Sequence, residues 1–100
     1  MAREKLVRDR IPEIIISEGR KPATRIAGTE EYRRKLSEKL EEEVAEFLAN
    51  MSTEEMADVL EVLHAICELE GIRMEDVERA RLVKKKERGG FSGRVILQQA

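Results

Sequence analysis

Four acidic residues are spaced so that they could hold a metal ion together. Glu43 and Glu46 lie three positions apart, and Glu55 and Asp58 have the same spacing. On an α-helix, residues three positions apart share one face. If each pair lies on one of two helices joined by a short turn, all four carboxylates point to one place. Four carboxylates cannot share a site unless a cation lies among them.

The type of ligand indicates which cation this would be. The set contains carboxylate oxygens and neither cysteine nor histidine, which suits a hard divalent ion rather than zinc. Mg²⁺ is the predicted cofactor, with Mn²⁺ as a substitute. Because Mg²⁺ typically keeps several waters and also binds phosphates, the predicted substrate is a nucleotide di- or triphosphate. The ion would neutralise phosphate charge and orient, or help to deprotonate, an attacking water.

The first of the two helices is predicted to begin with Thr29 as its cap and to run to about Ala49. At about 100° per residue, its apolar side chains span an arc of roughly 160°. Glu43 falls inside this arc and Glu46 just outside its edge, whereas Glu42 projects toward solvent. An acid on the core face has to be paired, protonated or bound to a metal.

The second helix is predicted for residues 53–70, after a turn at residues 50–52 and before Gly71. Its apolar arc is wider, roughly 180° at about 100° per residue, and a face this wide usually packs against more than one neighbour. Glu55 lies inside the arc and Asp58 at its margin. Each helix therefore places one acid in its core face and a second at the rim.

The rest of the chain predicts shorter or less regular elements. A short helix is expected over residues 12–18, a basic loop over residues 20–28 and a third long helix over residues 74–88. Residues 91–97 are β-prone and are expected to lie as a single strand, with Leu6 and Val7 as its candidate neighbours.

The expected fold is a single all-α domain over residues 1–100. Its core is an antiparallel helical hairpin, completed as a helical bundle by dimerisation, with a short extended C-terminal tail. A chain of 100 residues has room for one modest core, and small chains with a partly apolar helix pair often complete that core by oligomerising.

Two of the acids also have an ordinary structural interpretation. Glu43 can form an ion pair with Lys39, four positions earlier. Residues 52–55, Ser-Thr-Glu-Glu, fit a capping box in which Glu55 would bond back to Ser52. Taken singly, each acid fits a structural role as well as a functional one. The match of four positions on two adjacent helices favours the metal site.

Four basic residues are candidates for binding substrate phosphate. Lys39 projects next to Glu46, where it can touch a phosphate or only balance the acids. Lys84, Lys86 and Arg88 lie at the end of the third long helix, where cations also complement the helix dipole. Both interpretations stay open for each residue.

The composition argues against several classes of protein. Charged residues make up 40% of the chain and aromatic residues 3%, which favours solvated helices over a sheet sandwich. The net charge of −2 argues against a nucleic-acid partner. The longest apolar run, residues 14–16, is far too short to span a membrane, and a single cysteine fits a reducing compartment. The predicted location is cytoplasmic, with no membrane partner.

Two motifs resemble those of a known superfamily. Residues 42–46 (EEVAE) followed by residues 55–58 (EMAD) are similar to the EExxE…ExxD signature of MazG-like nucleoside triphosphate pyrophosphohydrolases. The ends KLVRDRIPEII and KKKERGGFSGRVIL resemble a short, single-domain, phosphoribosyl-ATP pyrophosphohydrolase-like branch. The gap between the two motif halves is eight residues, shorter than is typical of the superfamily, so the turn must be tight.

The resemblance implies an all-α dimer that cleaves between the α- and β-phosphates of a nucleoside triphosphate, using Mg²⁺, and releases a monophosphate and pyrophosphate. It implies Glu43, Glu46, Glu55 and Asp58 as metal ligands. Glu42 matches the first acid of the motif and is expected to support Glu43 in catalysis. The enzyme would be a house-cleaning pyrophosphatase for standard or damaged nucleotides.

Three other functions are compatible with the sequence. One is a true phosphoribosyl-ATP pyrophosphohydrolase, which differs only in the nucleotide it cleaves. Another is a non-catalytic helical module that binds a nucleotide or a protein, although a packing module would gain by replacing Glu43 and Glu55 with apolar residues. The last is nucleic-acid binding, which would require the basic residues of 20–25 and 84–88 to converge.

Overall fold

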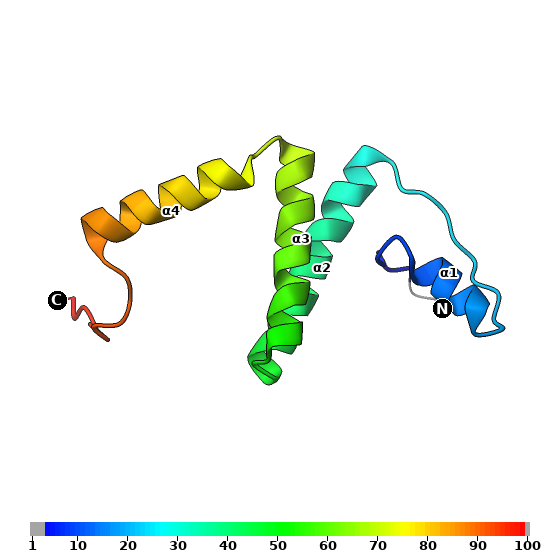
Figure 1. Cartoon of the computed structure of the whole chain (residues 1–100), viewed down its shortest axis with the longest axis horizontal. Helices are drawn as coiled ribbons and strands as arrows, with labels where there is room; N and C mark the ends of the chain where they lie inside the picture. The colour runs from blue at the N-terminus through cyan, green and yellow to red at the C-terminus, as the bar shows by residue number, and fades with distance from the viewer. Residues whose placement is uncertain (1–3, 100) are drawn as a thin grey trace.

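The computed structural model describes residues 4–99, which form four α-helices and no β-strand. In chain order these are α1 (Ile11–Ser17), α2 (Thr29–Ala49), α3 (Thr53–Glu70) and α4 (Met74–Arg88). The two longest, α2 and α3, pack side by side as an antiparallel hairpin at the centre of the molecule (Figure 1). The predicted all-α class and the predicted hairpin are therefore confirmed.

Local signals explain where the hairpin helices begin and end. The Ser52 hydroxyl accepts a hydrogen bond from the backbone N–H of Glu55, which caps the start of α3. At the other end, Gly71 adopts a left-handed conformation with φ of 71°, which costs glycine little. The prediction for the start of α2 was wrong by one residue, because Gly28 occupies the cap position and Thr29 is already helical.

The core of the hairpin is small. Among the described residues, the buried apolar side chains are Leu36 of α2 and Val59 and Val62 of α3. Glu43 is buried in the same interface, with 6% of its surface exposed. The predicted position of this acid, inside the apolar arc of its helix, is therefore confirmed.

The segment that precedes α1 is fixed to α2 by polar contacts. The Arg25 guanidinium bonds both Glu4 and Glu31, with N–O distances of 2.6–3.0 Å. The Lys35 ammonium donates to the backbone carbonyl of Glu4 at 3.0 Å. Arg25, which lies in the basic loop expected over residues 20–28, therefore links Glu4 to α2.

Helix α4 extends away from the hairpin as an arm, and the C-terminal tail follows it (Figure 1). No residue of α4 is buried, and the tail is equally open, with Phe91 98% exposed. Residues 91–99 are non-helical, as expected, but they form no strand. The tail and Leu6–Val7 lie on opposite sides of the hairpin, so the predicted pairing between them is wrong.

The molecule is unusually open for its size. Its radius of gyration is 18.1 Å, whereas a compact domain of 100 residues has about 13 Å. Its accessible surface is 9125 Å², against about 5,800 Å² for a compact monomer of the same mass. None of the helices among the described residues is long and apolar enough to cross a membrane.

Candidate metal centre

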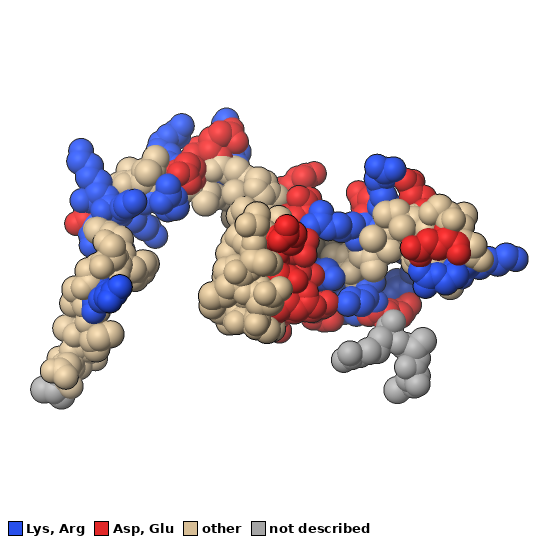
Figure 2. Space-filling model, turned by 60° about the horizontal axis from the view of Figure 1, so that its bottom comes forward, with Lys and Arg blue, Asp and Glu red and all other residues tan. Residues whose placement is uncertain are grey.

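Three carboxylates from the two helices of the hairpin meet at one place. Oxygen atoms of Glu43, Glu55 and Asp58 all lie within 4.8 Å of one another. Acidic side chains gather on the side of the hairpin that faces the N-terminal segment, whereas its other side is largely uncharged (Figure 2). The structure thus brings together three of the four residues that the helical spacing selected as metal ligands.

Glu43 lies deepest of the three. One of its carboxylate oxygens lies 3.2 Å from the Lys39 ammonium, so the ion pair expected from the structural interpretation is present. The other oxygen, Oε2, is buried without a hydrogen-bond partner. Because an unsatisfied buried carboxylate oxygen is costly, Lys39 alone does not account for this residue.

Glu55 uses its backbone for capping but leaves its carboxylate free for the cluster. Its N–H donates to the Ser52 hydroxyl at 3.2 Å. The reciprocal half of a capping box is missing, since the Ser52 N–H donates to the Asn50 carbonyl instead, at 2.8 Å. Glu55 Oε2 is buried and has no partner. The capping interpretation therefore explains the backbone of this residue and not its side chain.

The surroundings of Glu55 make its ionised form unfavourable. Burial is the main cause that raises its pKa above the ordinary value, and the negative charges of Glu46, Asp58 and Glu43 raise it further. This arrangement is the one expected when several acids approach one another without a cation between them.

Glu46 is the fourth predicted ligand, and it is exposed. It is outside the group of three oxygens that lie within 4.8 Å. Its negative charge nevertheless helps to raise the pKa of Glu55, so it lies close enough to act on that carboxylate. The sequence prediction of a core acid and a rim acid on α2 agrees with this arrangement.

Two basic residues from the N-terminal segment also reach the site. Arg8 bonds Asp58 at 2.8 Å, and Lys5 bonds Glu42 at 2.8 Å. Glu42 lies 3.6 Å from the Lys39 ammonium as well. The hydrogen bond from Lys5 is the largest effect that lowers the pKa of Glu42, and the same bond raises the pKa of Lys5.

The ion pairs at the site do not reach all three carboxylates. Arg8 contacts Asp58 and Lys39 contacts Glu43, whereas among the described residues no cation contacts Glu55, whose Oε2 is buried without a partner. Oxygens bound to one Mg²⁺ at about 2.1 Å lie roughly 3–4 Å apart, so small side-chain movements would let the three carboxylates share an ion.

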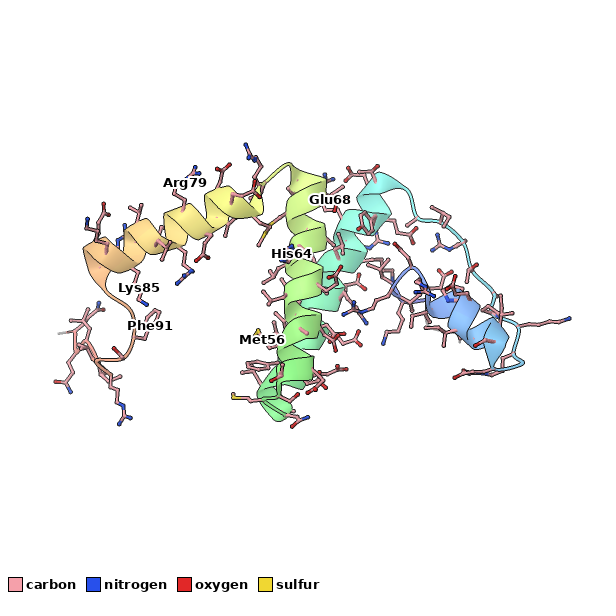
Figure 3. The ribbon with its side chains drawn as sticks, in the orientation of Figure 1. Met56, His64, Glu68, Arg79, Lys85 and Phe91 are labelled. Carbon is pink, nitrogen blue, oxygen red and sulfur yellow. The ribbon has the colours of Figure 1, made fainter. Side chains whose placement is uncertain are left out.

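The predicted phosphate-binding residues divide into two groups. Lys39 lies at the carboxylates, as expected. Lys84, Lys86 and Arg88 are exposed on α4, and this arm leads away from the carboxylate side of the hairpin, as neighbouring Lys85 shows (Figure 3). Within one chain, these three residues do not join the site.

Sequence reasoning missed Lys5 and Arg8. They lie 37 and 50 residues from the acids they contact, so no local spacing links them to the site. The one signal was the likeness of the opening KLVRDRIPEII to the flank of a known family, in which neither residue was given a role.

Comparisons with known proteins give little further information. A protein from Mycolicibacterium smegmatis (strain ATCC 700084 / mc(2)155), described as uncharacterized, is 54% identical over 44 residues. These residues are 44% of this chain and 45% of that protein, so the chain spans less than half of its relative's length. The chain matches no family model and no solved structure. The relative's description supplies no activity to consider for this chain.

Proposed function

We propose that the protein is a Mg²⁺-dependent nucleoside triphosphate pyrophosphohydrolase that releases a nucleoside monophosphate and pyrophosphate. One observation carries this proposal: Glu43, Glu55 and Asp58 converge, and two of their buried oxygens have no partner. A purely structural cluster would be expected to satisfy those atoms. The resemblance of residues 42–46 and 55–58 to the MazG-like signature supplies the reaction.

Each acid of the site would have a defined role in this reaction. Glu43, Glu55 and Asp58 would hold the ion, and Glu46 would join them from the rim or through a bound water. Glu42, which is held by Lys5 and Lys39, would assist in orienting the attacking water. When bound, Mg²⁺ supplies charge neutralisation of the phosphates and activation of that water.

The exposed surface supports a homodimer or larger homo-oligomer as the working form. The accessible surface of one chain exceeds that of a compact monomer by roughly 3,300 Å², and two chains together therefore have more excess surface than the roughly 2,000–5,000 Å² that a permanent interface buries in total. Large apolar side chains are exposed on the hairpin, among them Leu48 at 61% and Leu60 at 46%. Lys84, Lys86 and Arg88 would bind substrate only if the arm of a partner brought them to the site.

The decisive test is turnover of a panel of nucleoside triphosphates and phosphoribosyl-ATP, with and without Mg²⁺, followed by chromatography of the products. The Glu43→Gln variant should lose about 100-fold or more in activity, since it removes the most buried ligand. Glu41→Gln is the matched control, because Glu41 is an exposed acid on the same helix, and it should retain activity. The nucleotide cleaved fastest distinguishes the general pyrophosphatase from the phosphoribosyl-ATP enzyme.

Two other results would change the interpretation. If nothing is cleaved, but Mg²⁺ raises the melting temperature of the wild type and not of Glu43→Gln, the metal site exists and the substrate lies outside the panel. If Mg²⁺ has no effect and Glu43→Gln is more stable than the wild type, the acids are packing residues. A binding module without catalysis would then replace the enzyme.

A further inference from the structure

We infer that Lys5, Arg8 and Lys39 together bind phosphate in this site. Lys5 and Arg8 lie on residues 4–10, which we call the N-terminal strap, and Lys39 lies on α2. The ligand would be the phosphate chain of the substrate, bound next to the divalent ion. This inference rests on the proposed function, because it assigns the residues that take the substrate's phosphates in the same site.

The placement of the two cations carries the inference. Lys5 contacts Glu42 of α2, and Arg8 contacts Asp58 of α3, each at 2.8 Å. The strap therefore contacts both helices of the hairpin, with one cation on an acid of each helix. Lys39 completes the set from within α2, at 3.2 Å from Glu43. These three cations would supply positive charge for a phosphate chain bound beside the ion.

Further contacts hold the N-terminal strap in place. Glu4, next to Lys5, is bonded by Arg25, which Glu31 holds in turn. Its backbone carbonyl accepts from Lys35 at 3.0 Å. The strap is therefore attached to α2 through Glu4 as well, independently of the bonds from Lys5 and Arg8 to the acids.

Lys5 and Arg8 are also accessible to a ligand. Each side chain is 56% exposed, unlike Lys39, which is 20% exposed. A divalent ion bound to Asp58 would neutralise the negative charge that attracts Arg8. The positive charge of the ion would also repel the Arg8 guanidinium. The released guanidinium has the planar, forked geometry that binds phosphate through two hydrogen bonds. Metal binding would thus free Arg8 from its ion pair with Asp58, so that it can bind phosphate.

Isothermal titration calorimetry on the full chain can test this inference, with Mg²⁺ alone and then with pyrophosphate in excess Mg²⁺. In Arg8→Gln and Lys5→Gln, pyrophosphate affinity should fall about tenfold each, the loss of one charge-assisted bond to phosphate. Mg²⁺ affinity should stay the same or increase, because a competing cation is gone. Arg8→Lys should recover part of the lost affinity. Thermal melting of each variant verifies that it is folded.

Arg10→Gln is the matched control. Arg10 lies two residues beyond Arg8, bonds Glu13 at 2.7 Å and is 82% exposed, outside the carboxylate site. Its variant should bind pyrophosphate as the wild type does. The inference is overturned if Arg8→Gln and Lys5→Gln keep wild-type affinity for pyrophosphate, or if the wild type binds Mg²⁺ but no pyrophosphate.

The two proposals can fail separately. If the wild type cleaves nucleotides and the strap variants bind pyrophosphate normally, only the strap assignment falls. If no nucleotide is cleaved but pyrophosphate binding depends on Lys5 and Arg8, the anion site stands and the hydrolase proposal loses support.

Discussion

Glu55 shows how one residue can serve two purposes at a helix start. Its backbone N–H is satisfied by Ser52, which leaves the carboxylate free to turn toward Glu43 and Asp58. That carboxylate is partly buried, has an oxygen without a partner and lies among like charges. Without a cation the arrangement is unfavourable, so it should be visible in how stability depends on pH.

The raised pKa of Glu55 determines whether its contribution to stability increases or decreases with pH. The folded state holds the proton more tightly than the unfolded state, so the contribution of Glu55 to stability falls as pH rises above the ordinary value of 4.5. Without divalent ions, Glu55→Gln should therefore melt higher than the wild type at neutral pH, and this advantage should vanish below about pH 4.5. Thermal melts of both proteins across pH would measure the difference.

Addition of Mg²⁺ provides the control for this prediction. The ion should raise the melting temperature of the wild type at neutral pH and have little effect on Glu55→Gln, since a ligand stabilises the folded state that binds it. A difference between the two proteins that does not change with pH would show that Glu55 is not strained by its charge.

At the scale of elements, the hairpin is defined by its ends. The turn at residues 50–52 is short, and its last residue, Ser52, caps α3 by accepting the bond from the Glu55 N–H. This cap also sets where the carboxylates of Glu55 and Asp58 lie along the helix. The start of α3 is therefore a point where local stability and the geometry of the site meet.

Replacement of the cap tests this connection. Ser52→Ala should reduce the free energy of unfolding by about 1 kcal/mol, the usual cost of losing a serine cap. Denaturant titration would measure it. Ser37→Ala is the control, because the Ser37 hydroxyl bonds only the Arg33 carbonyl within α2, and its effect should stay within about 0.5 kcal/mol. Equal effects of the two changes would argue against a special role for the cap.

The whole molecule exposes far more surface than a compact chain of this length. Three apolar side chains are buried among residues 4–99, whereas large apolar groups of the hairpin, α4 and the tail are exposed. So small a core cannot offset the conformational entropy lost on folding. Association of several copies would supply the missing burial.

Substitution on the exposed face of α3 tests the assembly. Leu60→Lys should convert a dimer or larger oligomer to monomers and lower the melting temperature by roughly 10 °C or more, because it places a charge in an apolar interface. Glu61→Lys introduces the same side chain at the neighbouring exposed position and should have little effect.

Light scattering coupled to size-exclusion chromatography would measure the mass of the assembly. In the wild type this mass should be an integral multiple, two or more, of the 11.5 kDa of one chain. The melting temperature of the wild type should also rise with protein concentration. A wild type that is monomeric at all concentrations would contradict the proposed oligomer.

Much of the fold could be predicted because its signals are local. The bounds of α3 and α4 follow from a cap, charge placement and terminal glycines within a few residues. The burial of Glu43 followed from the periodicity of α2 alone. The expected strand over residues 91–97 failed because β-propensity forms a strand only where a partner strand is available.

The sequence by itself determined which acids share a helix face, because helical periodicity depends only on spacing along the chain. It thereby selected Glu43, Glu46, Glu55 and Asp58 before their contacts were known, and three of the four, Glu43, Glu55 and Asp58, come together in the structure. Only the tertiary structure decided that Lys5 and Arg8 join them and that, within one chain, the α4 arm with Lys84, Lys86 and Arg88 leads away from the site. The reason is physical: such contacts depend on where the connecting segments fold, and no periodicity of a single element records that.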